Sequence, residues 1–254
     1  MQALFPFLNP GLLIAVLGIA FCSGFVKGVV GFAMPLVMIS GLTLFLAPEL
    51  ALAGLILPTL VANIAQAMRQ GPAAAWGSIK KFRYFLFAGG VALVLAAQTV
   101  RVLPIEALQL AIGVPTVGYA ILQLAGVQFQ LPHQRPIMES FVGVVAGIMG
   151  GLSAVWGPPT VMYLTALNTP KADQMRIQGV IYCAGSIALV GAHLGSGVLR
   201  TETVPFSILL ILPAFAGMWV GGRVVDAIDQ VMFKRATLLV LLLAGSNLIR
   251  RALF

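Results

Sequence analysis

Long apolar runs separated by short basic gaps make up almost the whole chain, and this pattern limits what it can fold into. The runs cover residues 12–30, 35–47, 50–68, 84–100, 105–124, 141–155, 160–167, 177–194, 204–225 and 231–249. Only 9% of the residues are charged, against about 25% in a soluble domain. About 20 apolar residues are needed to cross a bilayer as a helix. Because no alternation of period two is sustained, helices are the only spanning structure left. We therefore predict an all-α, polytopic membrane protein.

The net charge of +8 comes from Lys and Arg residues that lie mostly in the gaps between apolar runs. A nucleic-acid partner would favour a basic face or stripe instead. An excess of Lys and Arg in short loops is typical of the cytoplasmic side of a membrane protein. We expect no nucleic-acid partner, and we place the densest basic loop, residues 69–83, in the cytoplasm.

Motifs for catalysis, metal binding or nucleotide binding are absent from the sequence. Cys22 and Cys183 lie inside apolar runs and form no CxxC pair, which disfavours a disulfide framework or a zinc site. The chain has no GxxxxGK[ST], no HExxH, no paired carboxylates and no plausible triad. The start lacks a basic region of the signal-peptide type, so we expect its first apolar run to be retained. We predict no enzyme activity, no catalytic residue, no metal and no cofactor.

The two halves of the chain repeat the same order of segments. Each half has five apolar runs, and the second run of each is too short to cross about 30 Å of hydrocarbon alone. Three residues of the first half recur at constant spacing in the second: Gly24, Gly28 and Pro35 correspond to Gly147, Gly151 and Pro158. Matched residues within matched runs indicate an internal repeat. We predict a first membrane repeat at 1–126, a connecting loop at 127–138 and a second membrane repeat at 139–254.

The distribution of Lys and Arg predicts how the two repeats are oriented. In one arrangement, each short segment folds back on the run before it, or the short segment and that run both cross the membrane. This arrangement puts more Lys and Arg residues on the side of the 69–83 loop. In the other arrangement, the short segment and the run before it make one broken span, and fewer Lys and Arg residues lie on that side. The favoured arrangement has an odd number of crossings per half, so the repeats are inverted and both termini lie outside. Each repeat then has a broken or re-entrant helix pair plus three spanning helices, as in many secondary transporters.

Two stretches, residues 23–35 and 146–159, end an apolar run with clustered glycines and close with proline. Glycine weakens a helix, and proline stops one and favours the start of another. We therefore predict helix breaks at membrane depth, which are tolerated only inside protein or along a cavity. The restarting helices at Pro35 and Pro158 would direct free N–H groups at an anion. The alternative is close helix packing through small residues such as Gly24 and Gly28.

These paired motifs, one opening each half, resemble those of the sulfite exporter TauE/SafE family, also called the toluene sulfonate uptake permease family. The resemblance extends over essentially the whole chain. It implies a secondary carrier for sulfur-containing anions such as sulfite, sulfoacetate or aryl sulfonates, in a bacterial cytoplasmic (inner) membrane. The usual family motif is richer in glycine. Lys27 interrupts the first copy here, and Ser153, Val155 and Trp156 stand in the second.

Lys27 is the most informative single residue because an ammonium inside an apolar run costs about 2.5–3.5 kcal/mol on insertion scales. We expect Lys27 to face a water-filled cavity and to neutralise a sulfonate or sulfite; the alternative is a lysine that extends to a nearby interface. The remaining predicted substrate-binding residues are Gly28, Gly31, Phe32, Met34, Pro35, Asn63, Gln66, Gly150, Gly151, Ser153, Trp156, Gly157, Pro158, Thr160, Tyr182 and Ser186.

Each group of these residues has an expected role and a structural alternative. The backbone after Met34 and Gly157 would donate N–H groups. Trp156 and Phe32 would form apolar walls, and Asn63 and Ser186 would bind oxygen atoms. The alternatives are core packing for the aromatic residues and hydrogen bonds between helices for the polar ones.

The predicted function is alternating-access transport of an organosulfonate or sulfite-type anion. The open alternatives are a carrier for a carboxylate or other organic anion, an anion channel, and a membrane-embedded enzyme or assembly factor. A proton or a sodium ion is the candidate coupling ion. The transport direction and the oligomeric state are left open.

Overall fold

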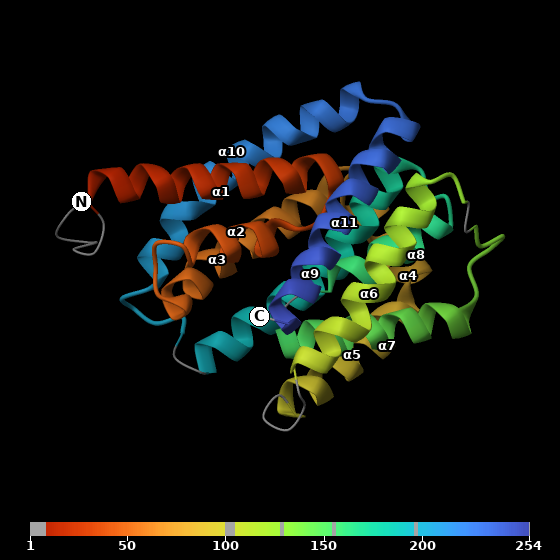
Figure 1. Cartoon of the computed structure of the whole chain (residues 1–254), viewed down its shortest axis with the longest axis horizontal. Helices are drawn as coiled ribbons and strands as arrows, with labels where there is room; N and C mark the ends of the chain where they lie inside the picture. Colours follow the sequence, from red (N-terminus) through yellow and green to blue (C-terminus); the bar gives the residue numbers. More distant parts are fainter. Residues whose placement is uncertain (1–8, 100–104, 128–129, 154–155, 196–197, 254) are drawn as a thin grey trace. The chain divides into compact units, whose positions relative to one another are not determined.

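The structure is a computed structural model that describes residues 9–99, 105–127, 130–153, 156–195 and 198–253. Over these residues it contains α-helices and no strand, which confirms the predicted all-α class. The helices, drawn in Figure 1, are α1 (Pro10–Val30), α2 (Met34–Leu42), α3 (Pro48–Met68), α4 (Pro72–Lys81), α5 (Arg83–Thr99), α6 (Ile105–Leu124), α7 (Pro136–Ser153), α8 (Gly157–Ala166), α9 (Lys171–Gly195), α10 (Val204–Ala227) and α11 (Gln230–Leu253).

Four of the described helices, α1, α3, α10 and α11, are long and apolar enough to cross a membrane. Shorter apolar stretches lie in α5, α6 and α7. Spans of 21 to 24 residues correspond to helices of about 30–36 Å, since each residue adds about 1.5 Å. The chain is therefore a multi-pass membrane protein, as predicted.

The helices divide into two compact units. Unit 1 comprises Met1–Ala65 and Ser186–Ala227, and unit 2 comprises Gln66–Gly185 and Ile228–Phe254. The unit boundaries fall inside α3 and α9, so each unit contains helices from both halves of the sequence. The division into repeats at 1–126 and 139–254 stays a prediction about the sequence.

In unit 1, α1 packs closely on α10; both helices are labelled in Figure 1. A Cβ atom on Gly24 would overlap the carbonyl oxygen of Ala214, and one on Gly28 would overlap that of Met218. Since both contact positions advance together along the chain, the two helices run in the same direction. Small residues allow such an approach.

In unit 2, α7 packs along α5 in the same way (Figure 1). A Cβ atom on Gly143 would lie 2.6 Å from the carbonyl oxygen of Phe85. One on Gly147 would overlap the carbonyl oxygen of Gly89. These two helices also run in the same direction. Each helix that opens a half of the sequence is therefore paired with a helix from the other half.

The short helices α2 and α8 each turn back along the helix that precedes them. In unit 1, Gly41 near the end of α2 lies against the side chain of Ile19 in the middle of α1. In unit 2, the carbonyl oxygen of Ala166 at the end of α8 accepts a 2.8 Å hydrogen bond from the N–H of Leu131, which precedes α7. Each pair is therefore a hairpin rather than one broken span.

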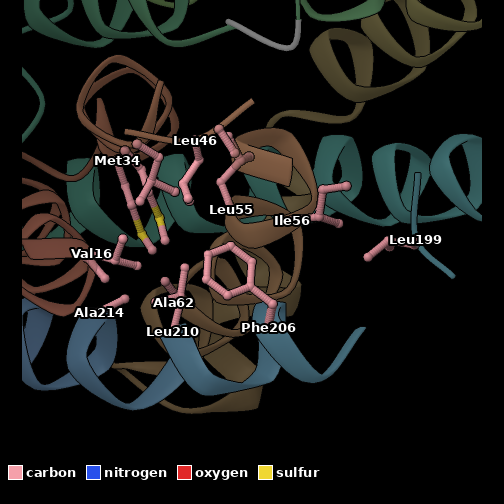
Figure 2. Close-up of a cluster of buried hydrophobic side chains, with 14 residues drawn as sticks. Val16, Met34, Leu46, Leu55, Ile56, Ala62, Leu199, Phe206, Leu210 and Ala214 are labelled. Atoms are coloured by element: carbon pink, nitrogen blue, oxygen red, sulfur yellow. The ribbon is translucent and has the colours of Figure 1, made fainter. Parts of the chain in front are cut away.

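The buried core of unit 1 surrounds α2 (Figure 2). Met34, Met38 and Leu42, spaced one turn apart on this helix, are fully buried. They pack with apolar side chains of α1, α3 and α10, including Phe206 and Leu210. A helix of nine residues is too short to be stable alone in water, so this packing holds it in place.

Pro58 lies inside α3 and has no N–H to donate to the carbonyl oxygen of Gly54 one turn earlier. The hydroxyl of Ser207 in α10 donates to that carbonyl at 3.3 Å and accepts from the N–H of Leu57 at 3.2 Å. In membrane helices, side-chain hydroxyls of neighbouring helices often bond the backbone groups that a proline leaves without a partner.

One helix was not predicted from the sequence. The basic stretch 69–83, treated above as a loop, contains α4. This helix is short, begins at Pro72 and ends with Lys80 and Lys81. Long apolar runs do not reveal it, because α4 carries polar and basic residues on part of its surface.

Candidate functional site

The first Gly-rich stretch contains the predicted helix break. α1 ends at Val30, and Gly31 adopts a left-handed conformation (φ 85°) while its N–H donates to the carbonyl oxygen of Lys27 at 2.7 Å. Ala33 also has a positive φ of 69°, which is uncommon for a residue other than glycine. α2 then restarts with Pro35 in its first turn and has no side-chain cap at Ala33.

Lys27, in the last turn of α1, is 2% exposed. Its Nζ atom donates a 2.6 Å hydrogen bond to Oδ1 of Asn63 in α3. The Nδ2 atom of Asn63 in turn donates to Oγ of Ser186 in α9 at 2.5 Å. Three residues predicted from the sequence as site residues therefore form one buried polar network in unit 1, which we call the Lys27 network.

This arrangement does not match extension of Lys27 to an interface, because its Nζ atom lies inside the protein. Burying a polar group is costly unless it is hydrogen-bonded, and burying a charge also requires pairing. The amide of Asn63 suits the position, since its carbonyl oxygen accepts from the ammonium while its NH₂ group donates to Ser186.

Sequence reasoning missed Thr59, which lies one turn before Asn63 on the same face of α3. Its side chain is 1% exposed. Its hydroxyl has no hydrogen-bond partner among the residues that the structure describes. The spacing of Thr59 and Asn63 was the available signal, but threonine is common in membrane helices and does not stand out alone.

The second Gly-rich stretch also interrupts its helix, and its residues gather in unit 2. α7 ends at Ser153 and α8 begins at Gly157, with Trp156 at its N-cap and Pro158 in its first turn. The Thr160 hydroxyl donates to the carbonyl oxygen of Trp156 at 3.0 Å. The Tyr182 hydroxyl donates to the carbonyl oxygen of Gly157 at 3.4 Å.

The indole of Trp156 occupies a slot between two glycines. A Cβ atom on Gly150 would lie 2.7 Å from the ring, and one on Gly185 would lie 3.0 Å from it. The ring centroid is 6.5 Å from that of Tyr182. The contacts described for the Trp156 ring are therefore packing contacts, and its role as a substrate wall stays a prediction.

The remaining predicted site residues occupy varied places. Gly28 packs against α10, and Phe32 and Met34 are buried. Gln66, in unit 2, donates from Nε2 to the carbonyl oxygen of Met175 at 2.8 Å. Gly151 lies in the last turn of α7 and is half-buried. The side chain of Ser153 and all of Val155 lie outside the described residues. A binding role for these residues stays a prediction.

Long apolar helices, two helix breaks and a buried, hydrogen-bonded lysine side chain characterise this multi-pass membrane protein. The family model of the sulfite exporter TauE/SafE family matches residues 16–248, and the chain belongs to this family. This confirms the family suspected from the Gly-rich motifs. No curated protein and no solved structure matches the chain.

Proposed function

We propose that this protein is a secondary transporter that carries sulfite or an organosulfonate across the bacterial cytoplasmic membrane. Membership of a sulfite exporter family supports a sulfur-containing anion. The Lys27 network is the observation that carries the proposal, because it puts a positive charge deep inside an apolar helix. Such intramembrane charges mark substrate and ion pathways.

The chemistry of the Lys27 network suits an anion with several oxygen atoms. The ammonium supplies a compact positive charge, and Asn63 and Ser186 supply neutral donors. Thr59, one turn from Asn63 on α3, adds a further hydroxyl. The break after Lys27 adds the first N–H groups of α2 and the positive end of its dipole. A sulfonate remains ionised at neutral pH and needs such a site to cross lipid.

The predicted site residues of unit 2 form a separate group. Trp156, Thr160 and Tyr182 surround the start of α8. The aromatic rings offer apolar walls, and Thr160 offers a hydroxyl. We propose that this group contacts substrates that have an apolar or aromatic body.

Alternating access is proposed for the transport cycle, as in other carriers with interrupted helices and inverted repeats. The tight pairs α1–α10 and α5–α7 each join a helix of one half to a helix of the other. We expect each pair to move together, because their backbones leave no room to slide. Each moving body would then contain helices from both halves of the sequence. A proton or sodium ion remains the candidate coupling ion.

The basic end of unit 2 supports the proposed orientation. Arg176 in α9 donates to Ser78 in α4 at 2.8 Å. Gln134, before α7, donates to the carbonyl oxygen of Lys81 at 3.0 Å. Together with the contact of Lys171 to Ile228, these bonds gather the basic helix ends. We place this end in the cytoplasm. α11 begins there, so the C-terminus lies outside; the N-terminus is also expected outside.

Transport by the purified full-length chain in liposomes tests the proposal. We expect saturable uptake of radiolabelled sulfite or toluene sulfonate and little uptake of acetate. Lys27→Met should abolish this uptake while the protein still folds. The matched control is Arg223→Met, which removes an exposed charge of unit 1 that stacks on Trp219 and should leave uptake intact.

Other outcomes would favour the alternatives. Preferential uptake of acetate would make the protein a carboxylate carrier. Single-channel currents in a planar bilayer would indicate a channel. Chemical conversion of the anion without uptake would indicate an enzyme. Equal uptake by Lys27→Met and the wild type would contradict the role given to Lys27.

A further inference from the structure

Unit 2 contains an apolar pocket that the proposed transport chemistry does not use. It has a volume of about 420 Å³ and lies between α6, α7 and α8. On α7 it is lined by Met138, Phe141, Val142 and Val145. This spacing defines one helix face. The opposite face of α7, which carries Gly143 and Gly147, packs on α5. The pocket therefore lies on the side of α7 that faces α6 and α8.

The pocket has a definite direction along the helices. Leu131, Met138 and Ala166 line one end, and the hydrogen bond from Leu131 to Ala166 fixes that end beside the segment before α7. From Met138 to Val145 the lining extends along two turns of α7, a rise of about 10 Å. The pocket therefore extends from the basic end of unit 2 toward the interior of the spans.

The rim of the pocket is open to the outside of the protein. Phe141 is 63% exposed and Met138 is 41% exposed, although both line the pocket. In a protein of this class, large exposed apolar side chains on a spanning helix face hydrocarbon. An apolar chain in the surrounding bilayer can therefore enter the pocket from the side.

Cationic and aromatic side chains lie at the same end. Arg135 comes immediately before α7, one turn before Met138. Gln134 contacts the carbonyl oxygen of Lys81, so the end of α4 lies beside Arg135. Lys80 lies over the Trp76 ring and Arg83 over the Tyr84 ring. Exposed Trp and Tyr beside Lys and Arg are typical of the membrane–water interface.

Three hydroxyl groups line the pocket, and they differ in their hydrogen bonds. Tyr163, one turn from the end of α8, lines the pocket and is 4% exposed. Its hydroxyl has no hydrogen-bond partner among the described residues. The hydroxyls of Thr116 and Tyr119, by contrast, donate to the carbonyl oxygens of Ile112 and Met162. Tyr163 is thus a buried donor placed just below the basic end.

We propose that this pocket binds one anionic phospholipid. The phosphate contacts Arg135 and the neighbouring basic residues of α4 and α5, which follows the preference of basic pockets near spanning helices for anionic lipid head groups. The Tyr163 hydroxyl donates to an ester carbonyl oxygen, which lies just below the phosphate in a phospholipid. One acyl chain lies along Phe141, Val142 and Val145. A free sulfonate fits poorly, because Tyr163 alone would donate to its oxygens inside the pocket.

Lipid binding can be measured on the purified full-length protein without any transport assay. We would add phosphatidylglycerol or phosphatidylcholine with identical acyl chains in detergent, and follow bound lipid by native mass spectrometry. Phosphatidylglycerol should bind more tightly than phosphatidylcholine. Arg135→Gln should weaken phosphatidylglycerol binding about fivefold, the effect of losing one basic contact near a membrane surface. Arg250 lies in the last turn of α11, away from the basic end of unit 2. Arg250→Gln is therefore the matched control and should bind like the wild type.

Two further variants separate the head group from the acyl chain. Tyr163→Phe should weaken both lipids while leaving the preference for phosphatidylglycerol unchanged. Val145→Phe should exclude the acyl chain and weaken both lipids. Equal affinity for the two lipids, equal loss in Arg135→Gln and Arg250→Gln, or displacement of the lipid by toluene sulfonate would each overturn the proposal. Arg135 is exposed, so we expect Arg135→Gln to fold. The test therefore remains valid even if Val145→Phe does not fold.

Discussion

Lys27 and Asn63 lie on different helices, and the 2.6 Å hydrogen bond between them holds the Lys27 Nζ atom inside unit 1. Removing one partner of a buried charged group destabilises a protein more than removing both partners together. The network therefore has a stability signature that can be measured separately from transport.

We predict that Asn63→Leu lowers the free energy of unfolding by about 1.5–3 kcal/mol, the usual contribution of a hydrogen bond to a charged group. In a Lys27→Met background the same substitution should cost much less, because the ammonium is gone. Chemical unfolding of the four proteins in detergent gives the coupling energy. Additive losses would show that the two side chains do not act together.

Gly24 and Gly18 provide a matched pair of glycines on α1. A Cβ atom on Gly24 would overlap the backbone of α10, whereas one on Gly18 meets nothing within 4 Å. We predict that Gly24→Ala destabilises the protein by about 1–3 kcal/mol, as overpacking usually does. Gly18→Ala should leave the thermal midpoint in detergent unchanged or slightly raised. A similar loss in both variants would argue against tight α1–α10 packing.

The hydroxyl of Ser207 compensates for Pro58 in α3. Ser207→Ala should cost about 1–3 kcal/mol, because it leaves the buried carbonyl oxygen of Gly54 without a donor. In a Pro58→Ala background the backbone N–H is restored, so the cost should largely disappear. Unfolding measurements on the single and double variants check this. An equal cost in both backgrounds would contradict the compensation.

Trp156 combines a packing contact with a proposed role in selectivity. Trp156→Ala should destabilise the protein by about 3–5 kcal/mol, because a cavity remains between Gly150 and Gly185. Trp156→Phe should retain most of the stability. If the indole also forms a substrate wall, Trp156→Phe should reduce uptake of toluene sulfonate more than uptake of sulfite. Equal reductions would leave Trp156 with packing alone.

Glu139 lies in the first turn of α7 but stabilises a different helix. Its Oε1 atom accepts a 2.9 Å hydrogen bond from the N–H of Phe85 in the first turn of α5. We predict that Glu139→Leu costs about 1–2 kcal/mol, in the range of a lost N-terminal cap. Glu139→Gln keeps an acceptor oxygen and should cost less. Thermal unfolding in detergent distinguishes the two, and identical losses would contradict the capping role.

Local features of the sequence determined the class of protein and the position of its helix breaks. Apolar runs must be helical in lipid because each helix satisfies its own backbone. Gly31 and Pro35 end and restart a helix through their own backbone geometry. The sequence also identified Lys27, Asn63 and Ser186 as candidates, because polar groups are costly in an apolar run. The hydrogen bonds among them were not predictable from this argument.

The tertiary structure decided which helices lie together. α1 pairs with α10 and α5 with α7, Trp156 fills a slot between two glycines, and Glu139 caps a helix other than its own. In lipid the hydrophobic effect does not select one apolar helix over another as a partner. The choice depends on how small residues and single polar groups on distant helices fit one another, and such a fit exists only in the folded chain.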